Sequence, residues 1–214
     1  MSYNKLTACL FNIFISIMIT FTTLLFSVNA ALDFKPLYYF DVVNLDIQND
    51  SYMTVAEIKD NYNYVINYVN GKTNYDFQLP TLPSSANGKT HFSDVRRLFR
   101  LSKIALIVQL ILLISFFYAF RKHNYFYKCL KWSGLALLFL PYLLLIILGS
   151  NFKRYFTIMH HLLFNNNYWL LDPAEDPIID LLPQTFFFHC VVLILLLTNL
   201  AGIVLYIIYR RRIN

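Results

Sequence analysis

Residues 185–209, TFFFHCVVLILLLTNLAGIVLYIIY, form the longest apolar run of this 214-residue chain, and no Asp, Glu, Lys or Arg interrupts it. The hydrocarbon core of a bilayer takes about 20 residues of α-helix to cross. The run therefore predicts a transmembrane helix. Three further runs of similar length lie at residues 6–26, 101–120 and 130–148. We expect an all-α integral membrane protein with four transmembrane helices.

The composition of the whole chain points to the same class. Apolar residues make up 57% of the sequence and charged residues only 14%, whereas a soluble domain carries roughly 25% charged residues. At this length we expect residues 1–214 to form a single membrane domain. The three cysteines have no CxxC spacing, which argues against a disulfide framework or a zinc site.

The first apolar run has two interpretations. Lys5 precedes it and Val28-Asn29-Ala30 follows it, as in a signal peptide with a small-residue cleavage site. The apolar part of a signal peptide is usually about 7–15 residues long, and this run is longer. We expect a retained helix, with cleavage as the alternative.

The charges outside the four runs predict the orientation. Three short segments that four spans would bring to one side hold eight basic residues and no acidic one: Lys5, Arg121, Lys122, Lys128, Lys131, Arg210, Arg211 and Arg212. Basic residues in short loops stay on the cytoplasmic side. Both termini are therefore expected inside, with residues 31–100 and 149–184 extracellular. The net charge of +6 then reflects topology, and no basic stripe with interleaved aromatics indicates nucleic-acid binding.

The long outer segment contains one clear helix signal. Thr54-Val55-Ala56-Glu57 has the form of a capping box, and apolar residues at helical spacing follow it up to Gly71. We expect a structured extracellular loop with an amphipathic helix there. Residues 75–89 are rich in proline, serine and glycine and predict irregular structure. Ser93-Asp94 predicts the N-cap of a helix that continues into the second span.

The short outer segment mixes large apolar side chains with asparagine and aspartate. Prolines at positions 173, 177 and 183 break any continuous helix. We expect an interfacial or re-entrant element before the fourth span. Irregular backbone at that depth needs protein or water to satisfy its polar groups, and this describes the rim of a membrane active site.

Histidines near the outer ends of the spans are the main candidates for chemistry. They are His91, His160 and His161, with Asp94, Asp172 and Asp176 available as orienting carboxylates. Imidazole titrates near neutral pH, so each ring could transfer protons in a reaction. The alternative is that each ring lies at the membrane interface with its hydrogen bonds satisfied and has no chemical role. His189 lies one turn into the fourth span. It either has a functional role, or its side chain simply extends to the membrane–water interface. His123 is expected to be solvated in the cytoplasmic loop.

Two stretches carry a family resemblance. Residues 160–173, HHLLFNNNYWLLDP, and residues 91–96, HFSDVR, resemble motifs of the lipoprotein intramolecular transacylase (Lit) family, small integral membrane proteins of Gram-positive bacteria. The family pattern has one histidine nine residues before the tryptophan, here His160 before Trp169, and another before the Asp-Val pair, here His91. The chain departs from that pattern at Arg96, Asn167 and Gln184, where the family commonly has lysine, aspartate and glutamate.

The resemblance implies an acyltransferase that needs no cofactor and no metal. Its partners would be membrane lipids and, as substrates, lipoproteins whose N-terminal cysteine carries a diacylglyceryl thioether. The sn-2 acyl chain would move to the cysteine α-amine and leave the lyso form. His160 would be the general base and His91 the acid or oxyanion stabiliser, or the reverse. The residues implied to orient these groups or to bind substrate are Asp94, Arg96, Asn166, Trp169, Asp172 and Asp176.

Two other functional classes fit the residues alone. One is a non-enzymatic membrane subunit whose outer segment docks a partner, in which case the histidines would have no chemical role. The other is a metal-dependent membrane hydrolase that uses His91, His160 and an aspartate.

Overall fold

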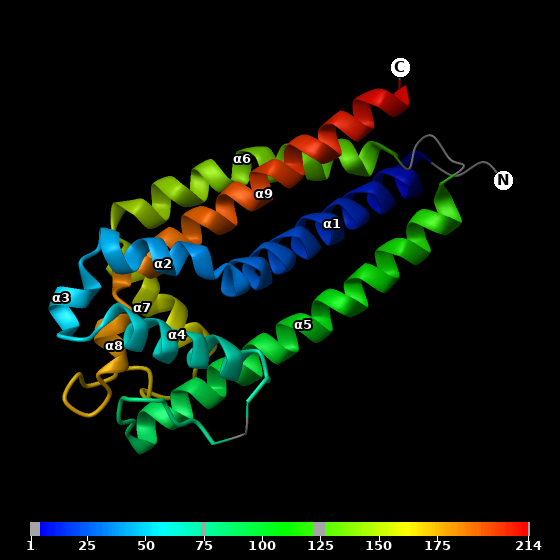
Figure 1. The fold of residues 1–214 in the computed structure, drawn as a ribbon. Coiled ribbons are helices and arrows are strands. Elements are labelled where there is room, and N and C mark those ends of the chain that lie inside the picture. Colours follow the sequence, from blue (N-terminus) through cyan, green and yellow to red (C-terminus); the bar gives the residue numbers. More distant parts are fainter. Residues whose placement is uncertain (1–4, 74–75, 122–126, 214) are drawn as a thin grey trace. The chain divides into compact units, whose positions relative to one another are not determined.

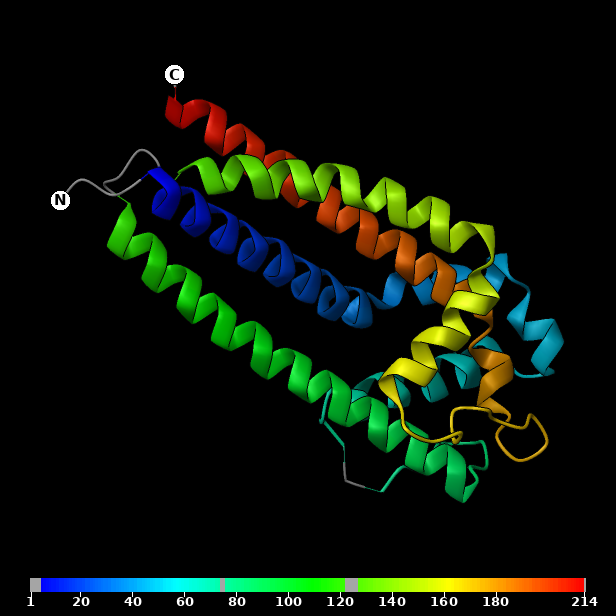
Figure 2. The same ribbon diagram turned by 180° about the vertical axis from the view of Figure 1, so that it is seen from behind.

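The computed structural model describes residues 5–73, 76–121 and 127–213, and within these ranges it contains helices and no strand. The helices, shown from two sides in Figures 1 and 2, are α1 (Lys5–Asp33), α2 (Lys35–Asn44), α3 (Ile47–Ser51), α4 (Val55–Val69), α5 (Ala86–Phe120), α6 (Lys128–Ser150), α7 (Phe152–Leu163), α8 (Ile178–Leu181) and α9 (Gln184–Ile213). The expected all-α fold is confirmed.

The chain forms two compact units. The first consists of Met1–Ala30, Lys103–Ile147 and Val192–Asn214, and the second of Ala31–Ser102 and Leu148–Val191. His123, one of the histidines considered above, lies outside the described residues.

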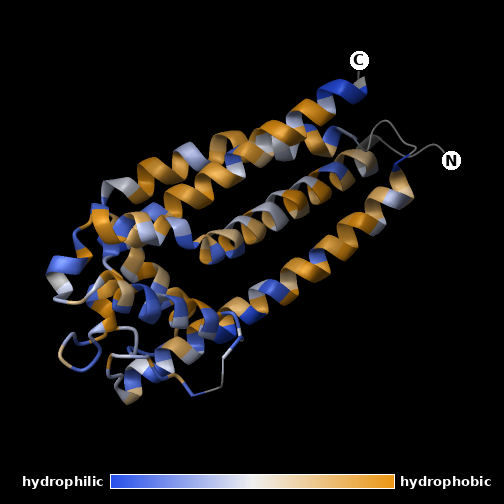
Figure 3. Cartoon of the chain, in the orientation of Figure 1, coloured by the Kyte–Doolittle hydropathy of each residue, from blue (hydrophilic) through white to orange (hydrophobic). Residues whose placement is uncertain are grey.

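The first unit contains the greater part of each of the four long helices. Among the described residues α1, α5, α6 and α9 are long and apolar enough to cross a membrane. These helices contain the four predicted runs, and Figure 3 shows apolar residues along their length. Many of their large apolar side chains are exposed, as expected of side chains that face lipid.

Close packing of α6 against α9 depends on two glycines. A β-carbon added to Gly202 would lie 3.0 Å from the carbonyl oxygen of Gly134. Small residues let helix backbones approach in lipid, where van der Waals contact drives association. Asn199 of α9 also donates a side-chain hydrogen bond to the Leu138 carbonyl oxygen of α6, at 3.1 Å. These contacts fix the two helices against each other.

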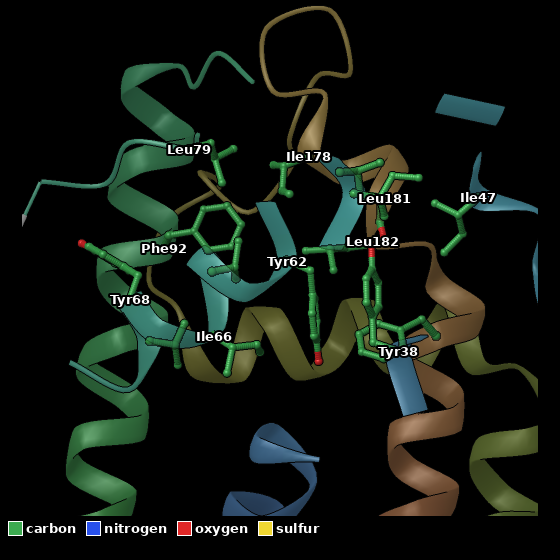
Figure 4. Close-up of a cluster of buried hydrophobic side chains, with 14 of the residues drawn as sticks. Tyr38, Ile47, Tyr62, Ile66, Tyr68, Leu79, Phe92, Ile178, Leu181 and Leu182 are labelled. Atoms are coloured by element: carbon green, nitrogen blue, oxygen red, sulfur yellow. Dashed lines mark hydrogen bonds between the residues drawn. The ribbon is translucent and has the colours of Figure 1, made fainter. Parts of the chain in front are cut away.

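The second unit has its own hydrophobic core, formed by α2, α3, α4, α8 and the adjoining turns of α5 and α9. Figure 4 shows part of this cluster. The Tyr38 and Tyr62 rings stack with their centroids 3.7 Å apart. The buried Tyr38 hydroxyl donates to the Leu181 carbonyl oxygen at 2.8 Å, so its polar atom is satisfied inside the core.

The capping-box prediction is confirmed at α4. The Thr54 hydroxyl accepts from the Glu57 amide at 3.3 Å, and the Glu57 carboxylate accepts from the Thr54 amide at 2.9 Å. The helix ends at Val69. Gly71 follows with a φ of +76°, a backbone conformation that residues with a side chain rarely adopt. Both ends of this helix follow from local sequence.

The predicted start of the next helix is wrong. The helix α5 begins at Ala86, so Ser93-Asp94 lies inside it and residues 86–89 are helical. Ser85 is the capping residue, because its hydroxyl accepts from the Gly88 amide at 3.0 Å. This cap is held by Asp176, which is 91 residues away in the sequence, so no local pattern reveals it.

Four helices of the described outer segments were not predicted: α2, α3, α7 and α8. Asn151 caps α7, its side-chain oxygen accepting from the Arg154 amide at 3.1 Å. Residues 164–177 are not helical, and Pro183 immediately precedes α9, so the predicted break of the helix is confirmed. The re-entrant position of this segment stays a prediction.

Candidate active site

His91 and His160 meet in the second unit. His91 lies in the second turn of α5 and His160 in the last turn of α7. The centroids of the two rings are 6.0 Å apart, at an interplanar angle of 39°. Only 9% of His91 and 8% of His160 is exposed. The motif pair recognised in the sequence is therefore one buried site, although 69 residues (160 − 91) separate its members.

A hydrogen bond to the backbone defines the proton positions of His160. Its Nδ1 lies 2.8 Å from the Phe156 carbonyl oxygen, one helical turn earlier. A carbonyl oxygen only accepts, so Nδ1 carries the hydrogen. In the neutral ring Nε2 then has the free lone pair. His160 is thus held in the tautomer that a general base needs.

Aromatic rings fix the plane of His160. The Trp169 ring stacks on it with centroids 4.7 Å apart at 28°, and the Phe156 ring meets it edge-on at 4.4 Å. The Phe164 ring contacts both histidines, with its centroid 5.8 Å from that of His160 and 5.2 Å from that of His91. Sequence analysis missed Phe156 and Phe164, although their spacing of four residues on either side of His160 places both beside it.

Burial sets the protonation of His160. It lowers the pKa of the ring because a charged imidazolium loses its hydration. The hydrogen bond to the Phe156 carbonyl opposes this shift, and the neighbouring His161 adds to it. The net lowering of the pKa keeps His160 neutral near pH 7. A neutral imidazole with a free Nε2 can accept a proton.

Asp176 holds the start of the helix that carries His91. Its carboxylate accepts from the Ser85 amide at 2.8 Å and from the Ser85 hydroxyl at 2.6 Å. Asp176 is only 2% exposed. A carboxylate is favourable at a helix N-terminus, where free amides and the helix dipole present positive charge. Asp176 therefore holds the N-terminus of α5 through Ser85, and its orienting role toward the histidines stays a prediction.

Gly88 makes room for that carboxylate. A β-carbon at position 88 would lie 2.8 Å from the carboxyl carbon of Asp176. Position 88 is one turn before His91, on the same face of α5. Sequence analysis named neither Ser85 nor Gly88 as a site residue; a glycine three residues before the histidine was the available signal.

A second link joins the two motifs. The Asn166 side-chain amide donates to Asp94 at 3.0 Å, and its oxygen accepts from the Tyr168 amide at 3.1 Å. Asp94 is one turn after His91 on α5. Asn166 and Asp94 therefore connect the His91 helix to the turn that carries Trp169.

Two predicted residues have other contacts. The Arg96 guanidinium donates to the Thr73 carbonyl oxygen at 3.2 Å and lies over the Tyr68 ring at 4.7 Å. Asp172 accepts from the Ala174 amide at 3.0 Å and so shapes its own turn. They support the loops around the site.

His161 and His189 have different surroundings. His161 is exposed and meets the Trp169 ring edge at 5.2 Å. His189 pairs with Asp41, its Nδ1 lying 2.9 Å from both carboxylate oxygens. Asp41 is fully buried, whereas 29% of the His189 side chain is exposed. Sequence analysis left His189 open between function and interface, and missed Asp41.

The donor set at the histidine pair does not suit a metal. Across residues 5–73, 76–121 and 127–213, no three His, Cys, Asp or Glu side chains are grouped so that they could hold an ion. A metal-dependent hydrolase built on His91, His160 and an aspartate would need such a group.

Comparison with known proteins identifies the family. The family model described as "Lipoprotein intramolecular transacylase Lit" matches residues 13–187. The solved structure of the membrane integral lipoprotein intramolecular transacylase Lit from Bacillus cereus is 31% identical, with a TM-score of 0.91 over 98% of this chain and 97% of that one. A variant of that enzyme with one histidine replaced by alanine is also 31% identical, with a TM-score of 0.85 over 96% and 93%.

A search of curated protein sequences finds no match. The family model spans most of the chain, and the Bacillus cereus structure agrees with it in both sequence and fold. The chain therefore belongs to the lipoprotein intramolecular transacylase (Lit) family, and it is a multi-pass acyltransferase of the cell membrane.

Proposed function

We propose that this chain moves the sn-2 acyl group of a diacylglyceryl-cysteine lipoprotein to the α-amine of the same cysteine. One observation carries the proposal: a buried His160, held by the Phe156 carbonyl with Nε2 free, lies 6.0 Å from a second buried histidine. An ester and an amine on one molecule can react between two such rings. Membership in the Lit family supports a lipoprotein substrate.

The first half of the reaction uses the base. The substrate α-amine has a pKa of about 7.7–8.0 when free. The neutral amine is the nucleophile: its lone pair attacks the carbonyl carbon of the sn-2 ester, and His160 Nε2 takes one proton from the attacking nitrogen. The result is a tetrahedral intermediate with a negative oxygen. Because donor and acceptor belong to one molecule, holding both in place gives the advantage of an intramolecular reaction.

The second half uses the acid. The bond from the carbonyl carbon to the glyceryl oxygen breaks, and an N–H of His91 gives the leaving oxygen its proton. His91 regains a proton from the imidazolium of His160. The net change is one C–O bond broken, one C–N bond formed, and one proton moved from nitrogen to oxygen. The roles of the two histidines can be exchanged without altering this balance.

We place both termini in the cytoplasm and the histidine pair at the outer face. Eight basic and no acidic residues lie in the three short segments between and beyond the spans on the inner side, and such segments are retained inside. An enzymatic reporter that is active only outside the cell, fused after Asn214, is expected to be silent. Activity of that reporter would contradict the orientation.

Mass spectrometry of a lipoprotein N-terminal peptide tests the reaction. Intramolecular transfer leaves the total mass unchanged but moves one acyl chain from an alkali-labile ester to a stable amide. Cells that express the protein should yield the N-acyl form, and cells without it the diacylglyceryl form. A peptide that loses a fatty acid would indicate hydrolysis. A mixture of labelled and unlabelled lipopeptides should show no exchange of label, because each molecule reacts with itself.

A further inference from the structure

Unpartnered polar atoms gather around His160. In the second unit three buried side-chain nitrogen or oxygen atoms have no hydrogen-bond partner among the described residues: Ser84 Oγ, His91 Nδ1 and Trp169 Nε1. Buried polar groups are nearly always paired, so each exception needs an explanation. Two of the three belong to rings next to His160: Trp169 at 4.7 Å and His91 at 6.0 Å between centroids. The explanation is therefore to be found at the candidate site.

The indole nitrogen is the more informative of these atoms. An indole N–H can only donate, so it is satisfied only by an acceptor. No described residue supplies one, and the nitrogen is shielded from solvent. A hydrogen-bond acceptor on the substrate would satisfy the indole N–H. The substrate of the proposed function carries ester carbonyl oxygens, which are acceptors of this kind.

The position of Trp169 is fixed before substrate binds. One face of its ring lies on His160 at 28°, and the His161 ring meets it nearly perpendicularly, at 89° and 5.2 Å. The Asn166 to Asp94 hydrogen bond of 3.0 Å ties the same turn to α5. A donor held in this way needs no reorganisation when charge develops, and this is the property that makes an oxyanion donor effective.

The reaction needs a donor at this place. When the amine attacks and His160 takes its proton, negative charge forms on the carbonyl oxygen. That oxygen is bonded to the carbon under attack, so it lies close to His160, and the stacked Trp169 ring lies beside the same imidazole. We infer that the Trp169 indole N–H is a catalytic hydrogen-bond donor to the carbonyl oxygen of the migrating acyl group. The inference rests on the proposed function and leaves His91 to protonate the glyceryl oxygen.

Replacement of one atom tests this role. The full-length protein is made with 3-benzothienylalanine at position 169, which keeps a fused aromatic ring and replaces N–H by sulfur. Turnover of a synthetic diacylglyceryl-cysteine peptide is followed by chromatography and mass spectrometry. We expect kcat to fall about 10²–10³-fold, with KM within a few fold. The same replacement at Trp132, the other tryptophan and an exposed residue of α6, should leave kcat unchanged.

A second measurement does not depend on the fold of that variant. A thionoester substrate, with sulfur in place of the carbonyl oxygen, accepts hydrogen bonds poorly. The unmodified protein should discriminate against it, and Trp169→Phe should discriminate much less, whatever its absolute rate. Equal discrimination by both proteins, or full activity of the benzothienylalanine protein, would overturn the inference and show that Trp169 serves only to pack against His160. Absence of turnover by the unmodified protein would instead contradict the proposed function.

Discussion

Gly88 and Asp176 are matched in space: a β-carbon at position 88 would lie 2.8 Å from the Asp176 carboxyl carbon, well inside van der Waals contact. The same carboxylate binds the amide and the hydroxyl of Ser85. The first turn of α5 is therefore held to the segment after α7, and His91 follows one turn later. We expect the position of His91 to depend on this contact.

The first prediction concerns Gly88→Ala. The added methyl group must displace Asp176 from the Ser85 cap, so we expect a loss of about 1–3 kcal/mol in the free energy of unfolding and a lower rate of acyl transfer. Thermal unfolding in detergent and turnover of a lipopeptide measure the two effects. Gly149→Ala is the matched control, because no atom lies within 4 Å of its added β-carbon.

A double-mutant cycle tests the contact itself. In an Asp176→Ala background the carboxylate is gone, so Gly88→Ala should cost less than it does in the unmodified protein. An undiminished cost there would mean that position 88 acts through something other than Asp176.

The second prediction concerns the base. His160→Ala removes the free Nε2 beside His91, and the loss of a positioned base typically lowers the rate by about 10²–10⁴-fold. His91→Ala is expected to have a similar effect, and the double variant should lose less than the product of both, since the two rings act as a unit. Turnover per folded molecule is the measurement.

The controls for the base are the other histidines. His161→Ala and His123→Ala should retain substantial activity. If His161 proved essential and His160 dispensable, the match of the motif to the chain would be off by one residue. If neither His160 nor His161 affected turnover, the general base would be another residue.

The third prediction concerns pH. Burial lowers the pKa of His160, with the Phe156 hydrogen bond opposing and His161 adding to the shift. A base works when unprotonated, so His160 should remain active below pH 6.5, about where an ordinary histidine becomes charged. The substrate amine titrates at about pH 7.7–8.0. A plot of log(kcat/KM) against pH should therefore rise with a slope of one between the two values.

At lower pH, the slope of the same profile depends on the protonation of His160. Below its lowered pKa the slope should increase to two, and in His160→Ala it should stay at one throughout. A second break at or above about pH 6.5 would be inconsistent with a depressed pKa for the base.

The fourth prediction concerns the hydrogen-bonded pair of Asp41 on α2 and His189 on α9. His189→Ala leaves the fully buried Asp41 carboxylate without its imidazole partner. We expect a loss of about 1–3 kcal/mol in the free energy of unfolding, toward the lower value because the His189 side chain is 29% exposed. Asp41→Asn keeps an acceptor for the imidazole N–H and should cost less. Unchanged stability together with lost turnover would indicate that this pair is catalytic.

The sequence alone was sufficient for features that depend on local chemistry. Four charge-poor runs predicted the four long helices, because crossing the bilayer core takes about 20 consecutive, mostly apolar residues in a helix. Thr54 and Glu57 predicted the start of α4, since a capping box needs only residues three positions apart. The residues of the two motifs also led to the Lit family, and from there to His91 and His160.

Tertiary structure decided what depends on residues far apart in the chain. The start of α5 was misplaced because its cap is completed by Asp176, from another segment. The partnership of Asp41 with His189 spans 148 residues, and no pattern within a single helix encodes it. The orphaned indole N–H of Trp169 likewise follows from packing, because burial decides which polar atoms keep a partner and which remain free for a substrate.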